Sequence, residues 1–341
     1  MVRAGLIAGL LILLAACGRE DAREPGAPGD IPASLPPRFY PPEGWAWDTL
    51  PQEKPQRYGV AAPRSFPAAT IIILPGYGEP AEVWFETAAD LIAQGYTVWI
   101  LDRAGQGGSA RYASPHDLGF VPAFDTDSKG LQTFLGAVVK PRPDDVVVVL
   151  AHADAAATAL VAIGAGLKVD GLIASSAELA TTKGSPLLKI ARRADTPPFG
   201  WRPWREDGPD DHFLGRTHDR ERGGLRHTWM LSKPNLRLSG PSMGWLEAFS
   251  GASREAAEAS GKVAPAVLMV NPNQPASNLC SKLPACREEE LSGARTAIHL
   301  EADRWRGPWL DMIDGFIAGR VAVRQRGIIS AASTTPYVNR P

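Results

Sequence analysis

Residues 145–155 read DVVVVLAHADA, and this stretch predicts a strand that turns sharply into a helix. The strand is predicted over 145–150, where valine and leucine follow one another without a polar break. Such an unbroken apolar strand is typical of a parallel sheet covered on both faces, because neither side of the strand meets water. A helix is predicted to follow over 154–166, so the stretch indicates one strand–helix unit of an α/β fold.

The same alternation extends outward from this unit in both directions. It breaks once, between about 178 and 262, where the chain is richer in Pro, Trp, Arg and Gly and shows no clear strand. The alternation of strands and helices predicts a doubly wound, mostly parallel sheet, and its interruption predicts a cap inserted between two strands. The other strands are predicted over 70–74, 96–101, 169–174, 264–270 and 287–291, and the other helices over 81–93, 126–139 and 308–317.

The N-terminus has the plan of a secretory signal. Arg3 supplies a positive charge, and residues 6–14 form an apolar stretch too short to span a bilayer comfortably. The Leu-Ala-Ala-Cys sequence that ends at Cys17 resembles the lipobox of bacterial lipoproteins, which predicts a signal peptide over 1–16 and a lipidated Cys17. Gly18, in place of an aspartate, favours the outer membrane. The alternative is an ordinary signal peptide that contains a cysteine.

The remaining chain divides by composition into a tether, a domain and a tail. Residues 17–56 are rich in Pro, Gly and charged residues and predict a tether that lifts the domain off the membrane. The α/β domain is predicted over 57–320, and a mixed tail over 321–341. The formal net charge of −1 offers no basic footprint for nucleic acid, so DNA and RNA are not expected as partners.

Two cysteines remain besides Cys17. Cys280 and Cys286 form an even pair in a chain predicted to be exported, and they indicate a disulfide. The alternative for them, a metal site, lacks a histidine at a familiar spacing. Neither a metal nor a cofactor is therefore expected from the sequence.

Several motifs together resemble one branch of the α/β-hydrolases, the lysophospholipases and monoacylglycerol lipases. The resemblance extends from about residue 58 to 319, and it implies an α/β-hydrolase fold and acyl-ester or lipid ligands. It rests on LPGYGE at 74–79, LDRAGQGGS at 101–109, PHDLGFV at 115–121, NLRLSGP at 235–241 and the Gly-Trp pair at 244–245.

The resemblance also locates the catalytic triad, and its three positions hold unsuitable residues. These enzymes place a serine nucleophile in a G-x-S-x-G turn, which here reads AHADA and puts Ala153 at the serine position. The acidic position matches Gln274 and the histidine position matches Thr296. The resemblance further implies that the backbone amides of Tyr77 and Asp154 would form the oxyanion hole.

A displaced arrangement is the alternative to a lost triad. Asp154 would act as a carboxylate nucleophile if the turn slipped by one residue, with His299 as its base, although no orienting carboxylate is evident. The simpler role for Asp154 is to cap the helix that begins there. His152 is expected to pack beneath the turn.

These residues lead to one preferred functional hypothesis and two alternatives. The preferred one is an inactive hydrolase scaffold that binds a lipid, an acyl ester or a protein partner whose identity the sequence does not reveal. The first alternative is an active ester hydrolase with displaced catalytic groups, and the second is a structural spacer without a ligand pocket. Four tryptophans in or near the cap are candidates to line an apolar pocket, the alternative being ordinary core packing: Trp201, Trp204, Trp229 and Trp245.

Overall fold

The computed structural model describes residues 31–179, 203–208, 215–272 and 278–334, and these residues build an eight-stranded sheet. The strands lie in the order β1-β2-β4-β3-β5-β6-β7-β8, and β3 to β8 pair in parallel, which confirms the predicted α/β fold. The strands are β1 (Ala46–Leu50), β2 (Gln56–Ala61), β3 (Ala69–Leu74), β4 (Tyr96–Leu101), β5 (Val147–His152), β6 (Gly171–Ser175), β7 (Ala266–Asn271) and β8 (Cys286–Glu290).

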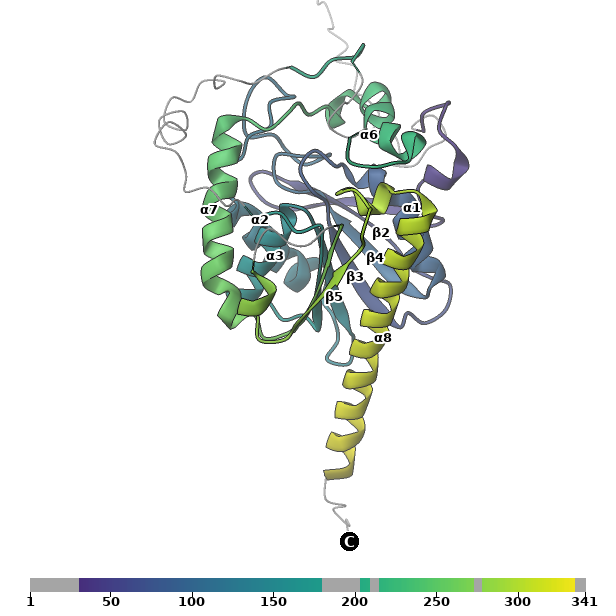
Figure 1. Cartoon of the computed structure of the whole chain (residues 1–341), viewed down its shortest axis with the longest axis vertical. Helices are drawn as coiled ribbons and strands as arrows, with labels where there is room; N and C mark the ends of the chain where they lie inside the picture. Colours follow the sequence, from purple (N-terminus) through teal and green to yellow (C-terminus); the bar gives the residue numbers. More distant parts are fainter. Residues whose placement is uncertain (1–30, 180–202, 209–214, 273–277, 335–341) are drawn as a thin grey trace, which may run out of the picture.

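Helices cover both faces of the sheet (Figure 1). Alternate side chains of β3 separate the two cores, since Ile71 and Ile73 face one set of helices, and Ile72 and Leu74 face the other. The first core includes α1 (Phe85–Ala93) and α8 (Asp303–Thr334). The second includes α2 (Asp125–Thr133), α3 (Ala155–Gly164) and α7 (Met243–Ala259). Burial on both faces explains the unbroken apolar strands in the sequence.

The predicted tether over 17–56 is too long, because its second half belongs to the folded domain. Leu35 and Phe39 are buried in the core beside α1. Strand β1 pairs antiparallel with β2, and β2 pairs antiparallel with β4, so both strands extend one edge of the sheet. The few apolar residues of this segment are scattered among prolines, and only their long-range contacts show that they are core.

The predicted cap over 178–262 also requires correction. Helix α6 (Arg220–Ser232) lies above the ends of the strands, as a cap helix would, but α7 packs along α3 in the layer that covers the sheet (Figure 1). The two helices approach so closely that a Cβ placed on Gly164 would lie 2.6 Å from the Cβ of Ala259. The insertion is therefore shorter than predicted and ends before α7.

The C-terminal helix extends beyond the predicted end of the domain. Helix α8 begins at Asp303 and continues without a break past residue 320, where a mixed tail was predicted (Figure 1). The side chain of Arg324 holds it to the body through Asp170 and the backbone oxygen of Pro143. The helix was underpredicted because its outer half mixes apolar and polar residues and shows no apolar stripe. Among the described residues, no helix combines the length and apolar composition that crossing a membrane requires.

The predicted disulfide is present between Cys280 and Cys286. It spans six positions and ends at the first residue of β8, and the two Cα atoms lie 5.4 Å apart. The bond therefore fixes the path of the chain as it enters the edge strand.

Candidate functional site

Ala153 occupies a sharp turn between β5 and α3. Its φ angle is +51°, a left-handed conformation that costs an alanine about 1–2 kcal/mol. The neighbouring strand holds the turn, because the Ala153 N–H donates to the Ser175 oxygen at 2.9 Å and the Glu178 N–H donates to the Ala153 oxygen at 3.1 Å. The strained turn of a hydrolase is thus retained without its glycines, but the side chain at its tip is a buried methyl group.

The predicted oxyanion donor of Tyr77 is already bonded within the protein. Its backbone N–H donates to the Oδ1 atom of Asp154 at 2.7 Å. The other oxygen of that carboxylate pairs with the Arg103 guanidinium, which also bonds Asp127. All three charged side chains are buried. A carboxylate of the chain therefore binds the amide that would stabilise the negative oxygen of a substrate in an active relative.

This arrangement does not support the two roles first considered for Asp154. Its carboxylate points to Tyr77 and Arg103, and its side chain makes no capping bond to α3. His299 faces a different set of neighbours: its ring stacks on Trp84 with the ring centroids 3.9 Å apart. Asp154 and His299 are therefore not placed as nucleophile and base.

His299 instead belongs to a buried cluster beneath the turn, together with His152 and Glu79. The Oε1 atom of Glu79 lies 3.6 Å from Nε2 of His152 and 3.6 Å from Nε2 of His299. The second oxygen, Oε2, accepts hydrogen bonds from the Gly76 N–H at 3.0 Å and the Trp84 indole at 3.1 Å. His152 lies under the turn as predicted, whereas Glu79 carried no separate signal in the sequence. The three side chains offer ligand atoms within 4.8 Å of one another, a spacing that suits a metal ion.

Burial controls the charge of this cluster. It raises the pKa of Glu79 to about 7, against the two hydrogen bonds that favour the carboxylate. It lowers the pKa of His152 to about 3 and the pKa of His299 well below its usual range. Both imidazoles are therefore neutral at pH 7.

The segment around Thr296 is fixed by a carboxylate that the sequence did not single out. Glu301 is fully buried and accepts hydrogen bonds from the backbone N–H of Arg295 at 2.6 Å and of His218 at 2.9 Å, with the His218 ring at 2.8 Å. Burial raises the pKa of Glu301, but these bonds outweigh it, so the pKa lies below its usual range. Thr296 lies in this segment and is partly exposed. Gln274, the third triad position, lies outside the described residues.

The cap is bonded directly to the loop that carries Tyr77. Arg226 of α6 donates to the Gly78 oxygen at 2.6 Å and to the Leu238 oxygen at 2.6 Å. The Tyr77 hydroxyl donates to the Ser239 oxygen at 3.0 Å, and the Tyr77 ring packs edge-on against Trp245. These bonds attach α6 and the segment that follows it to the loop beside the turn.

The tryptophans near the cap follow the core-packing alternative where the structure describes them. Trp229 packs against Phe85, Trp245 packs against Tyr77, and both are buried. Trp204 stacks on His227 instead. Trp201 lies outside the described residues.

Comparison with known proteins identifies the family. The family model described as serine aminopeptidase, S33, matches residues 65–274. The chain belongs to the serine aminopeptidase S33 family. This assignment agrees with the α/β-hydrolase fold and with the lysophospholipase and monoacylglycerol lipase branch that the motifs indicated.

Lysophospholipase L2 of Escherichia coli strain K12 is 28% identical to this S33 family member over 195 residues. The match covers 52% of this chain and 54% of the relative, so it spans about half the length of each. A soluble variant of monoglyceride lipase from Saccharomyces cerevisiae superposes with a TM-score of 0.62 at 15% identity, covering 80% of this chain and 94% of that one. Monoacylglycerol lipase from Paleococcus ferrophilus superposes with a TM-score of 0.59 at 17% identity, covering 79% of this chain and 100% of that one. At these identities the structural likeness shows the fold alone.

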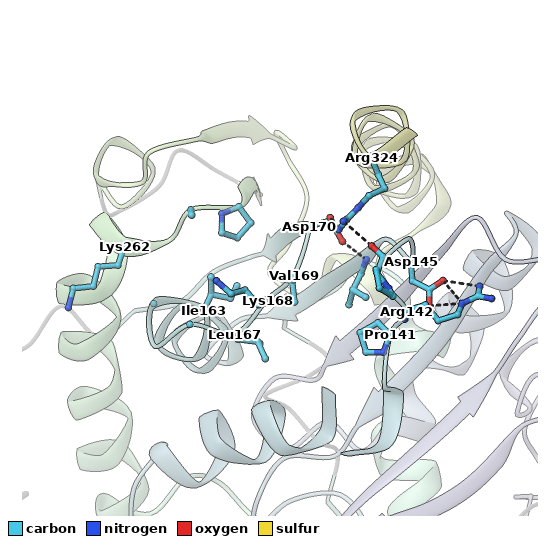
Figure 2. Close-up of a pocket in the computed structure, with 16 residues that line it drawn as sticks. Pro141, Arg142, Asp145, Ile163, Leu167, Lys168, Val169, Asp170, Lys262 and Arg324 are labelled. Atoms are coloured by element: carbon cyan, nitrogen blue, oxygen red, sulfur yellow. Dashed lines mark hydrogen bonds and ion pairs between the residues drawn. The ribbon is translucent and has the colours of Figure 1, made fainter. Parts of the chain in front are cut away.

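The S33 domain also carries a depression of about 640 Å³ far from the turn (Figure 2). It lies beside the N-terminal ends of β5 and β6, whereas Ala153 follows the C-terminal end of β5. Two ion pairs at its rim, Arg142 with Asp145 and Arg324 with Asp170, neutralise much of its charge (Figure 2). This depression is therefore not the counterpart of the hydrolase active site.

Proposed function

We propose that this S33 family member is an exported lipoprotein whose hydrolase domain does not cleave esters and instead binds an acyl lipid near the cap. The observation that carries the proposal is the pairing of Ala153 with Asp154. The first residue offers no nucleophile, and the second places a carboxylate on the Tyr77 amide. The lipid ligand is inferred from the names of its relatives, a lysophospholipase and two monoacylglycerol lipases.

The loss of chemistry has two independent causes at this site. Restoring a serine at Ala153 would supply an attacking oxygen, but the negative charge that develops on the ester would still meet the Asp154 carboxylate. Covalent catalysis thus requires both a nucleophile and a free amide. This distinguishes the present proposal from a simple loss of the serine.

The test compares labelling by a fluorophosphonate probe and hydrolysis of short acyl esters. The native full chain is expected to show neither, and so is a triple variant with Ala153→Ser, Gln274→Asp and Thr296→His. Adding Asp154→Ala to the triple variant removes the acceptor bonded to the Tyr77 amide and is expected to give labelling. Ester hydrolysis by the native chain would overturn the proposal. Ser176→Ala would then be the first variant to examine, because the Ser176 hydroxyl is buried near the turn and has no hydrogen-bond partner among the described residues.

Lipid binding and anchoring need separate measurements. Mass spectrometry of organic extracts from the purified full chain is expected to find an acyl lipid in near-stoichiometric amount, and an extract without one would contradict the ligand assignment. Cys17→Ser is expected to abolish incorporation of labelled fatty acid and to release the chain from the outer-membrane fraction. Unchanged labelling in Cys17→Ser would contradict lipid anchoring at this residue.

A further inference from the structure

The cluster beneath the turn brings together three donor atoms from distant parts of the chain. Glu79 follows β3, His152 ends β5, and His299 lies in the short 3-10 helix Ile298–Leu300 that precedes α8. All three side chains are almost fully buried. The cluster is separate from the acyl-lipid proposal, because its residues lie on the core side of the turn and pack against Trp84.

The distances within the cluster fit metal coordination better than direct hydrogen bonds. Both Glu79–imidazole distances are 3.6 Å, which exceeds the roughly 2.7–3.2 Å of a hydrogen bond to nitrogen. Ligand atoms that each lie about 2.0–2.1 Å from a tetrahedral metal are about 3.4 Å from one another. The two Glu79–imidazole distances are therefore close to the edge of a coordination tetrahedron, and all three ligand atoms lie within 4.8 Å of one another.

The hydrogen-bond inventory points to the same conclusion. Among the described residues, Nδ1 of His152 and both ring nitrogens of His299 have no hydrogen-bond partner, although they are buried. Buried polar atoms without partners are rare and call for an explanation, such as an ion. A metal held by the two Nε2 atoms would satisfy one of the two unpartnered ring nitrogens of His299.

The carboxylate is oriented as a metal ligand usually is. The bonds from the Gly76 N–H and the Trp84 indole both reach Oε2 of Glu79 and leave Oε1 directed at the two imidazoles. The Trp84 ring also fixes His299, since the two rings lie parallel within 3°. Outer contacts of this kind hold ligands in place at metal sites.

We propose that Glu79, His152 and His299 bind one divalent transition-metal ion of the zinc type. Two imidazole nitrogens and one carboxylate oxygen form a donor set that zinc accepts in tetrahedral sites, with a fourth position for another ligand. The ion would join the loop after β3, the end of β5 and the segment before α8. Its role is to hold these three segments together beneath the turn.

The chain offers a matched control in His218 and Glu301. This pair is also a histidine beside a buried glutamate, but its atoms are 2.8 Å apart and form a direct hydrogen bond. A histidine and a glutamate that are hydrogen-bonded directly to each other should not bind zinc tightly. Replacing His218 should therefore leave metal binding unchanged.

The test uses the full chain in detergent after removal of metals with a chelator. Titration with Zn²⁺ alone is expected to show one tight site per chain and to raise the melting temperature, and Co²⁺ is expected to give the visible absorption of tetrahedral coordination. His299→Gln and Glu79→Gln should each weaken Zn²⁺ binding by at least about 100-fold, beyond the 10–100-fold typical of outer-shell changes. His218→Gln should bind as the native chain does.

Three outcomes would overturn the proposal: no stoichiometric Zn²⁺ binding by the native chain, unchanged binding in both ligand variants, or an equal loss in His218→Gln. Circular dichroism without metal checks that each variant folds. If a ligand variant fails to fold, X-ray absorption of the native zinc-loaded chain decides the question. Two imidazoles and one carboxylate around the metal would support the site, and any set lacking the two imidazoles would exclude it.

Discussion

The left-handed turn at Ala153 can be tested by replacing alanine with glycine at two places. In Ala153→Gly the turn keeps its shape but loses the steric cost of the Cβ atom. In Ala157→Gly, in α3 immediately after the turn, an equally buried alanine is replaced within a regular helix. Comparing the two variants isolates the strain, because both lose one buried methyl group and both gain the same freedom in the unfolded chain.

The magnitudes follow from the structure. Losing a buried methyl group costs about 0.8 kcal/mol, and the flexibility of glycine costs about 0.5–1 kcal/mol, so Ala157→Gly should destabilise the domain by about 1.5 kcal/mol. Ala153→Gly loses the same methyl group and gains the same flexibility, but it relieves about 1–2 kcal/mol of strain at φ +51°. Its stability should therefore be close to that of the native chain.

Urea unfolding of the native chain and both variants measures the difference. Ala153→Gly should unfold at nearly the native midpoint, and Ala157→Gly at a clearly lower one, with similar slopes. If both variants lose about the same stability, Ala153 is not strained. The conclusion that the chain retains the sharp turn of an active hydrolase would then be refuted.

Three further predictions concern the N-terminal segment, the contact between α3 and α7, and the dependence of stability on pH. Deleting residues 1–30 should leave the melting temperature of the domain unchanged, whereas extending the deletion through 31–56 should prevent folding; equal stability of the two truncated chains would show that β1 is dispensable. Gly164→Ala should destabilise by about 1–3 kcal/mol in chemical unfolding, because its methyl group would clash with α7, whereas Gly315→Ala, which has open space, should be neutral or stabilising. The lowered pKa of Glu301 means that its contribution to stability is present above the unfolded value of about 4.3 and is lost as the pH falls through the lower folded value. Melting temperatures of Glu301→Gln should consequently fall less steeply in acid than those of the native chain, and parallel curves would contradict this assignment.

The sequence predicted the centre of the fold well because that centre is locally encoded. The runs at 70–74, 96–101 and 145–150 consist mainly of apolar residues, and each was confirmed as a strand within two residues at either end. Strands β1 and β2 were missed because their stability comes from the pairing of β1 with β2 and of β2 with β4 and from packing near α1, which no local pattern reveals.

The candidate site was likewise predictable only in part from the sequence. Ala153 could be located from its position after a strong strand, and the structure describes the turn expected there. The bond from Tyr77 to Asp154 joins residues 77 positions apart, and the cluster of Glu79, His152 and His299 is equally dispersed. Such contacts depend on the order of the strands, which places the ends of β3 and β5 side by side.

Helix α8 has a consequence for the order in which the protein folds during synthesis. Its first turns complete the core: Trp309, Ile313 and Ile317 are fully buried, and the Trp309 indole donates to Ser175 at the end of β6. The face of the central strands that α8 shares with α1 therefore stays partly uncovered until residues 309–317 have been synthesised. The nascent chain must keep this apolar surface from aggregating until then, so delays in translation just before these residues should favour misfolding.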